Sequence, residues 1–221
     1  MIREALVWLQ TELGKGTGDT AQSWSEALLG SLNFWGLLEG THLLTLILFA
    51  GTIFVVDLRL LGVTFRRTPV SVVSDRVLPL TVVGFAVLIA TGLALFFAKP
   101  VVYYHNVWFR AKLVFLVLAM LNIVIFHSRV QRNQKAWDTL ATPPRGAQIA
   151  AVLSLLSWVL VIAMGRFIPY NWFDCGKPIP HIVNVLQDCK ASEQGAVDKQ
   201  YMAKLGAKIG DKPATNGGAA Q

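Results

Sequence analysis

The stretch LLTLILFAGTIFVV, residues 43–56, decides the fold of this chain. It carries no charge, and with its N-terminal flank it forms a largely apolar block over residues 33–56. A helix of about 20 residues crosses a hydrocarbon core of roughly 30 Å. In lipid, backbone polar groups must be bonded within a helix or around a closed barrel, and the stretch lacks the apolar–polar alternation of a barrel strand. It is therefore predicted to be a transmembrane helix.

Three further blocks of this kind follow, at residues 77–98, 108–126 and 147–168. The whole chain of 221 residues is 54% hydrophobic and 15% charged, whereas a soluble domain is about 45–50% apolar and about 25% charged. Four spans can bury a core only by packing against one another. The sequence thus predicts an all-α fold, an integral membrane four-helix bundle formed by a single domain over residues 33–170.

Positive charge is concentrated in two of the three loops. The loop after the first block and the loop after the third each carry four basic residues: Arg59, Arg66, Arg67 and Arg76, then Arg129, Arg132, Lys135 and Arg145. The link between the second and third blocks has Lys99 alone. The positive-inside rule places the two basic loops in the cytoplasm and both termini on the outer, periplasmic side of a bacterial inner membrane. Because the net charge of +7 brackets the spans rather than forming one basic face, nucleic acid is excluded as a partner.

The two ends of the chain are expected to lie outside the bilayer. Residues 1–32 are predicted to be amphipathic and to lie on the outer surface, since ALVWL at residues 5–9 is too short for the apolar core of a signal peptide. Residues 171–221 form an outer tail, which is expected to be flexible from about Ala207 onward. This tail holds both cysteines, Cys175 and Cys189, and an oxidising compartment favours a disulfide between them. The alternative is two free thiols in a reduced tail.

Four ionisable residues fall at one depth of the predicted bundle: Glu39, His42, Lys112 and Arg166. At about 1.5 Å of rise per residue, they lie within roughly one and a half helical turns of one another. One interpretation is a structural salt-bridge network in which Glu39 pairs with Lys112 or Arg166 and His42 hydrogen-bonds a neighbour. The other is a site for an anionic or redox cofactor, since ionisable groups inside a membrane are costly.

The cofactor hypothesis favours haem b. His42 would be an axial ligand and His105, just before the third span, a second one, so both are also the candidate metal ligands. Lys112 and Arg166 would hold the propionates, and Glu39 would orient His42 or carry a proton. Copper at His42 with Met164 is a weaker alternative. There is no Cys-x-x-Cys-His motif, which excludes a covalent haem, and Glu39-x-x-His42 is a single pair, which disfavours a di-iron site.

Several small and polar residues are predicted to serve packing. Gly36-x-x-x-Gly40 in the first span and Gly84 and Gly92 in the second would permit close approach of helices. Asn122 in the third span is predicted to form a hydrogen bond between helices. His127, at the end of that span, lies too deep to share a haem with His42 and is expected to cap the helix C-terminus.

Three runs of this sequence together resemble a family of bacterial four-helix membrane proteins catalogued as a domain of unknown function. The runs are LLEGTHLLTLILFAGTIFVVDLRLLG, WFRAKLVFLVLAMLNIVIFH and PPRGAQIAAVLSLLSWVLVIAMGRFIPY. The matching positions are Glu39, His42, Asp57, Leu58, Arg59, Lys112, His127, Trp158, Gly165 and Arg166. More remotely, the chain is similar to four-helix membrane proteins that carry b-type haem or handle copper. The resemblance implies the fold and a bacterial membrane, and it supplies no function.

The leading hypothesis is a membrane subunit that binds haem b and passes electrons between the quinone pool and a partner at the outer face. The outer tail with its two cysteines suits the docking of such a periplasmic redox partner or of a larger membrane complex. The runner-up is a cofactor-free accessory or assembly subunit of a larger complex. A transporter ranks last, because the four spans show neither inverted repeats nor broken helices.

Overall fold

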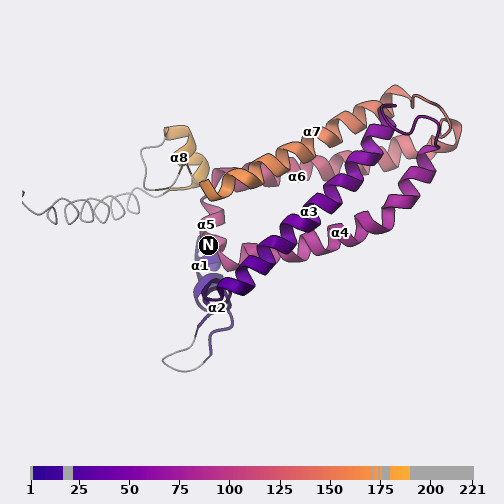
Figure 1. Cartoon of the computed structure of the whole chain (residues 1–221). Coiled ribbons are helices and arrows are strands. Elements are labelled where there is room, and N and C mark those ends of the chain that lie inside the picture. Colours follow the sequence, from indigo (N-terminus) through magenta and orange to yellow (C-terminus); the bar gives the residue numbers. More distant parts are fainter. Residues whose placement is uncertain (1, 17–21, 171, 174, 176–179, 190–221) are drawn as a thin grey trace, which may run out of the picture. The chain divides into compact units, whose positions relative to one another are not determined.

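Four long helices make up most of the structure (Figure 1). The computed structural model describes residues 2–16, 22–170, 172, 173, 175 and 180–189, and no strand occurs among them. The long helices are α3 (Leu32–Leu60), α4 (Val70–Ala98), α6 (Val107–Ile125) and α7 (Arg145–Phe167). Each lies in a helical segment long and apolar enough to cross a membrane, the third of which continues to Ala136. The prediction of an all-α chain with four helices able to span a membrane is therefore confirmed.

Two of these helices are longer than the apolar blocks that predicted them. Both α3 and α4 contain 29 residues, which corresponds to about 43 Å at 1.5 Å per residue. That exceeds the roughly 30 Å of a hydrocarbon core. α4 begins at Val70, directly after Pro69, rather than at the first residue of its apolar block, Val77. Apolar content therefore located the spans, whereas the helices continue beyond them into the polar boundary.

The core of the bundle is a cluster to which all four long helices contribute. Its buried members are Phe49 of α3, Ala119 of α6, and Trp158 and Val161 of α7, with Phe85 of α4 packed against them. The rings of Phe49 and Trp158 meet edge to face, with centroids 4.8 Å apart, a favoured geometry for aromatic pairs.

A side-chain hydrogen bond joins α6 to α7. Asn122 Nδ2 donates to the carbonyl oxygen of Ala150 at 2.9 Å. The predicted hydrogen bond of Asn122 between helices is confirmed. In the short π-helix η1 (Phe126–Val130) that follows α6, His127 Nδ1 lies 3.0 Å from the Ile123 carbonyl oxygen, in agreement with the predicted capping role.

Polar contacts link the two loops at the end of the bundle where α3 ends and α4 begins. Arg59 is fully buried, and its guanidinium donates to the carbonyl oxygens of Thr68 at 2.8 Å and Leu140 at 3.0 Å. The Asp138 carboxylate accepts from the backbone N–H of Ser71 at 2.7 Å and from its hydroxyl at 2.5 Å. The loop after η2 (Gln131–Ala136) thus satisfies orphan donors in the first turn of α4.

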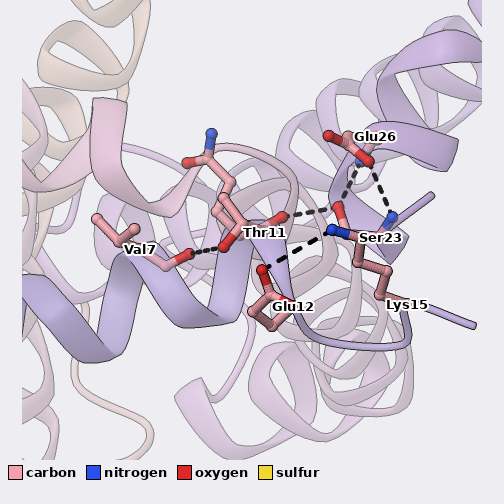
Figure 2. Close-up of polar contacts among 7 residues, drawn as sticks. Val7, Thr11, Glu12, Lys15, Ser23 and Glu26 are labelled. Atoms are coloured by element: carbon pink, nitrogen blue, oxygen red, sulfur yellow. Dashed lines mark hydrogen bonds and ion pairs between the residues drawn. The ribbon is translucent and has the colours of Figure 1, made fainter. Parts of the chain in front are cut away.

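The N-terminal segment contains two short helices, α1 (Ile2–Thr11) and α2 (Trp24–Gly30), joined by side-chain hydrogen bonds (Figure 2). Ser23 and Glu26 form a capping box at the start of α2, in which each side chain bonds the other's backbone N–H. The Ser23 hydroxyl also donates to the Gln10 carbonyl oxygen at 2.7 Å. Ser25 donates to the Ala98 carbonyl oxygen at 2.6 Å, so α2 is fixed to the end of α4.

The chain divides into two compact units. The first comprises residues 1–104 and 108–170, which include the N-terminal helices, the long helices, α5 (Pro100–Tyr104) and η3 (Ile168–Tyr170). The second comprises residues 105–107 and 171–221 and includes α8 (His181–Gln187). The tail beyond Ala207, expected to be flexible, lies outside the described residues.

Candidate functional site: a cavity between the long helices

A cavity of about 350 Å³ lies among the four long helices of the first unit. Its lining residues are His42, Leu46, Phe85, Leu88, Ile89, Gly92, Leu93, Phe96, Phe109, Lys112, Leu113, Leu116, Trp158 and Val161. His42 and Lys112 are the only ionisable residues of this lining, and the rest is predominantly aliphatic and aromatic. A small number of polar groups in an apolar cavity is typical of a site for a small organic ligand.

His42 of α3 is held in one orientation by α4. Its Nδ1 lies 2.9 Å from the hydroxyl oxygen of Thr91, which also lies 2.7 Å from the Val87 carbonyl oxygen. The hydroxyl and the ring nitrogen can each donate or accept, so this contact fixes the orientation of the ring. A neutral imidazole keeps a lone pair on one of its nitrogens, which suits a metal ion or a hydroxyl donor.

A glycine makes room for the imidazole. A Cβ atom at Gly92 of α4 would lie 3.2 Å from Cε1 of His42. This is shorter than an ordinary carbon–carbon contact of about 3.5–4.0 Å. Gly92 was predicted to permit close approach of helices, and what it accommodates is the ring of His42.

Lys112 of α6 lies against a second glycine. A Cβ atom at Gly165 of α7 would be 3.3 Å from the Lys112 ammonium nitrogen. Among the residues that the structure describes, Lys112 forms no ion pair and no hydrogen bond. A cation in a membrane span is expensive without a partner. An anion or a strong acceptor in the cavity would stabilise the Lys112 ammonium.

Three stacked rings close the cavity at the end where α4 finishes and α6 begins. Phe96 and Phe109 line the cavity, and Tyr103 of α5 packs on both, with ring centroids 6.3 Å from Phe96 and 5.2 Å from Phe109. Burial raises the pKa of the Tyr103 phenol above its ordinary value of 10.0, and the negative charge of Glu39 raises it further. Tyr103 is thus a neutral, largely apolar cover at any physiological pH.

The side of the cavity formed by α4 and α6 faces the surroundings of the bundle. Three aliphatic residues that line it are also exposed: Ile89, Leu93 and Leu113, at 42%, 52% and 45%. These residues lie within candidate membrane spans. If these helices cross a bilayer, exposed aliphatic side chains at this position face lipid, so this is the lipid-facing side of the cavity.

The structural interpretation is wrong for the ion pair of Glu39, while the hydrogen bond it expected from His42 to a neighbour is present with Thr91. Glu39 is exposed, and it forms no ion pair with Lys112, Arg166 or any other described residue. Arg166 is also exposed, with its guanidinium carbon 5.6 Å from the centre of the Tyr170 ring. Depth along a helix does not fix the face of the helix, because each residue turns the direction by about 100°. Gly165 contacts Lys112, and Arg166 points elsewhere.

The cavity lining includes neither His105 nor Met164. His105 belongs to the second unit, where its Nδ1 lies 2.9 Å from the Gln187 carbonyl oxygen. In the same unit Cys175 and Cys189 form a disulfide with Cα atoms 5.5 Å apart, the pair expected from the sequence. Of the predicted site residues, the structure thus brings His42 and Lys112 together in the lining of one cavity.

Sequence reasoning missed several residues of this site. Thr91, which orients His42, is a polar residue within an apolar span, and that isolation was a usable signal. Gly165 was noted only as part of the resemblance, and Phe96 and Phe109 look like ordinary lipid-facing aromatics in the sequence. Nothing in their spacing indicates that they close a cavity.

These features define a membrane protein with four candidate transmembrane helices and a cavity between them. A family of unknown function, DUF6644, has a family model that matches residues 31–171. The match covers more than half of the chain and all four long helices, so the chain belongs to this family. No curated protein and no solved structure matches the chain. The remoter resemblance to haem b and copper proteins stays a prediction.

Proposed function

We propose that the protein is a multi-pass subunit of the bacterial inner membrane that binds a lipid-soluble quinone in this cavity and takes part in electron transfer. One observation carries the proposal: His42 and Lys112, from two different helices, line one otherwise apolar cavity with a lipid-facing side. A quinone has an apolar ring and tail and two carbonyl oxygens. Its chemistry therefore matches an apolar lining with a few polar groups.

Each polar residue has a defined role in this proposal. The Lys112 ammonium donates a hydrogen bond to one quinone oxygen, and a charge-assisted bond of this kind is stronger than a neutral one. Reduction of a quinone to the quinol takes up two electrons and two protons. The lone pair of the neutral His42 imidazole accepts the hydrogen bond of a quinol hydroxyl, so His42 is suited to take that proton when the quinol is oxidised. The contact with Thr91 holds the ring in place for this role.

The haem b predicted from the sequence stays a prediction. The cavity lining supplies one imidazole, His42, and one cation for a propionate, Lys112. A haem with two histidine ligands would need a second imidazole, which the lining does not contain. The residues of the cavity therefore fit a quinone better than a bis-histidine haem.

The test of the quinone proposal is a binding titration. Trp158 lines the cavity, so a short-chain quinone analogue added to the purified protein in detergent should quench tryptophan fluorescence saturably. Lys112→Met should raise the dissociation constant about tenfold or more, since a hydrogen bond to a charged group contributes about 1.5–3 kcal/mol. Lys135→Met, which removes an exposed lysine outside the cavity, is the matched control and should bind like the wild type.

A reduced-minus-oxidised absorption spectrum of the same protein separates the remaining possibilities. A b-type band that disappears in His42→Ala would establish haem instead of quinone as the ligand of His42. If folded protein gives no band and no saturable quenching, the quinone proposal is wrong. The protein would then be the cofactor-free accessory subunit of a larger membrane complex, with the cavity occupied by lipid chains.

A further inference from the structure

The second unit brings together three side chains that are common metal ligands. One ligand atom from each of His105, Cys175 and Cys189 lies within 4.8 Å of the other two, and all three residues are half-buried. Two of the ligand atoms are the sulfurs of the disulfide. His105 comes from far away in the sequence, so its position beside both sulfurs is a product of the fold.

The imidazole of His105 is oriented for ligation by its own hydrogen bond. Its Nδ1 lies 2.9 Å from the backbone carbonyl oxygen of Gln187. A carbonyl can only accept, so Nδ1 carries the proton and Nε2 carries the lone pair. In metal sites, the ring nitrogen of a histidine that does not bind the metal usually donates its N–H to a carboxylate, a backbone carbonyl or a water.

Besides the covalent disulfide, several hydrogen bonds hold this arrangement. Gln187 is fully buried at the end of α8, and its side chain donates to the Phe173 carbonyl oxygen at 2.5 Å. The next residue, Asp188, adopts a left-handed conformation with φ of 55°. The N–H of Cys189 then bonds back to the Asn184 carbonyl oxygen at 3.3 Å. Gln187 therefore links the histidine to the segment before Cys175, and the turn fixes Cys189.

Two thiolates and one imidazole are a donor set for a thiophilic cation. Thiolate ligands select Cu⁺ and Zn²⁺ among the biological metals, and imidazole suits Zn²⁺ as well. A Cys₂His set with one open position is a known zinc arrangement. The carboxylate ligands that Ca²⁺ and Mg²⁺ prefer are absent from the cluster.

We propose that reduction of the Cys175–Cys189 disulfide converts this cluster into a binding site for Zn²⁺ or Cu⁺, with His105 as the third ligand. An external dithiol supplies two electrons and two protons and becomes a disulfide, while the S–S bond breaks and both cysteines become thiols. The metal ion then displaces the two thiol protons and binds both sulfurs and Nε2. The oxidised unit binds no metal, so metal binding reports the redox state of the outer segment.

The experiment uses the whole 221-residue chain in detergent, reduced with a phosphine under argon. Zn²⁺ and Cu⁺ are titrated separately against a chromophoric chelator, and the reduced wild type should take up one equivalent of at least one of them. The relative affinities decide which cation the site prefers. Oxidised protein and the double variant Cys175→Ser/Cys189→Ser should bind neither, and both set the baseline.

The role of His105 is tested by substitution with a matched control. His105→Ala in the reduced protein should weaken metal binding by about tenfold or more. Even the loss of a residue that only hydrogen-bonds to a metal ligand costs about that much. His181→Ala removes an exposed histidine of α8 outside the cluster and should leave the affinity unchanged. Substitution of Co²⁺ gives a second readout, because thiolate-to-cobalt charge-transfer absorption requires the sulfurs as ligands.

Three results would overturn the proposal. The first is reduced wild-type protein that binds no more metal than the double serine variant, with its helical circular dichroism unchanged. In that case the disulfide is a covalent crosslink and nothing more. The second is His105→Ala binding as tightly as the wild type, which removes His105 from the site. The third is equal metal binding by oxidised and reduced protein, which removes the redox control.

Discussion

At the scale of single residues, the glycines of the long helices serve different purposes. A Cβ atom at Gly84 of α4 would lie 3.4 Å from the Cβ and 3.5 Å from the backbone nitrogen of Phe49. A Cβ atom at Gly36 or Gly40 of α3 would meet nothing within 4 Å. The predicted close approach of helices is therefore confirmed at Gly84, whereas no described helix of this chain comes close at Gly36 or Gly40. The GxxxG spacing marks a smooth helix face, and it does not tell whether another helix covers that face.

This difference predicts opposite responses to the same substitution. Gly84→Leu should force α3 and α4 apart and lower the free energy of unfolding by about 1–3 kcal/mol, the usual cost of overpacking. Gly36→Leu places the same side chain in open space, and a better helix former there should leave stability unchanged or higher. Thermal unfolding of both variants in one detergent measures the difference. Equal losses of stability in the two variants would mean that a side chain at Gly84 does not push α3 and α4 apart.

Arg59 is the buried residue whose loss should cost most at the loop end of the bundle. Its two hydrogen bonds, to the Thr68 and Leu140 carbonyls, join the loop before α4 to the loop before α7. Arg59→Met keeps the length of the side chain and removes both bonds, so the free energy of unfolding should fall by about 3 kcal/mol.

Arg67→Met is the matched control for Arg59→Met, because it removes the same charge from an exposed position in the loop that follows α3. It should change stability by less than about 0.5 kcal/mol, as surface substitutions usually do. Chemical denaturation followed by tryptophan fluorescence compares the two variants. A loss in Arg67→Met as large as that in Arg59→Met would mean that net charge, and not the two hydrogen bonds, matters here.

At the scale of elements, the first turn of α4 depends on an acid from a distant loop. Burial acts to raise the pKa of Asp138, but the hydrogen bonds from the Ser71 hydroxyl and backbone, with smaller contributions from Gln134 and Val70, outweigh it. The net effect lowers the pKa of Asp138 below its ordinary value of 3.8. A negative charge at a helix N-terminus is also favoured by the helix dipole.

The sign of the pH dependence follows from this lowered pKa. A carboxyl group whose folded pKa lies below its unfolded value stabilises the fold fully above the unfolded value, here 3.8, and loses this effect as the pH falls through the folded pKa. The stability advantage of the wild type over Asp138→Asn should therefore be constant near neutral pH and shrink below pH 3.8. The advantage of the wild type over Asp75→Asn, a substitution at an exposed position of α4, should show no such change.

The measurement for Asp138 is the unfolding midpoint of the three proteins across the acidic range. A wild-type advantage over Asp138→Asn that persists unchanged at about pH 3 would show that Asp138 is not held ionised by Ser71 in the folded state. If the stability advantage of the wild type over Asp75→Asn shrinks in the same way, the effect belongs to the overall charge of the chain.

The existence of the four long helices could be predicted from the sequence, but their ends could not. Hydrophobicity reports what contacts lipid, and this is the only signal that the blocks carry. The start of α4 is set instead by Pro69 and by Asp138, which lies almost 70 residues further along the chain. A helix end fixed by a partner so distant in sequence leaves no local pattern to read.

The candidate site was likewise predictable in part. The cost of an ionisable residue in lipid singled out His42 and Lys112, and the structure places both in the cavity wall. The same argument included Glu39 and Arg166, which are exposed, because depth alone cannot tell the inner face of a helix from its outer face. The hydrogen bond with Thr91 that orients His42 depends on how α3 and α4 face each other, which only the fold determines.

At the scale of the whole molecule, charge should decide how the protein sits in the membrane. The loop after α3 carries Arg66 and Arg67, and the segment after α6 carries Arg129, Arg132 and Lys135. The positive-inside rule then predicts that both loops lie in the cytoplasm and both termini on the outer side. That orientation also gives the disulfide the oxidising environment in which such bonds persist.

Single cysteines test this orientation in a background that carries Cys175→Ser and Cys189→Ser. Lys15→Cys, in the exposed turn after α1, should react with a membrane-impermeant maleimide applied to the outer face of spheroplasts. Arg67→Cys, in the loop after α3, should react only once the membrane is permeabilised. Both positions are exposed, so a difference in labelling reports the side of the membrane and not burial. The reverse pattern would place both termini in the cytoplasm, where the disulfide would be reduced and the cysteine–histidine cluster would be available to metal from the start.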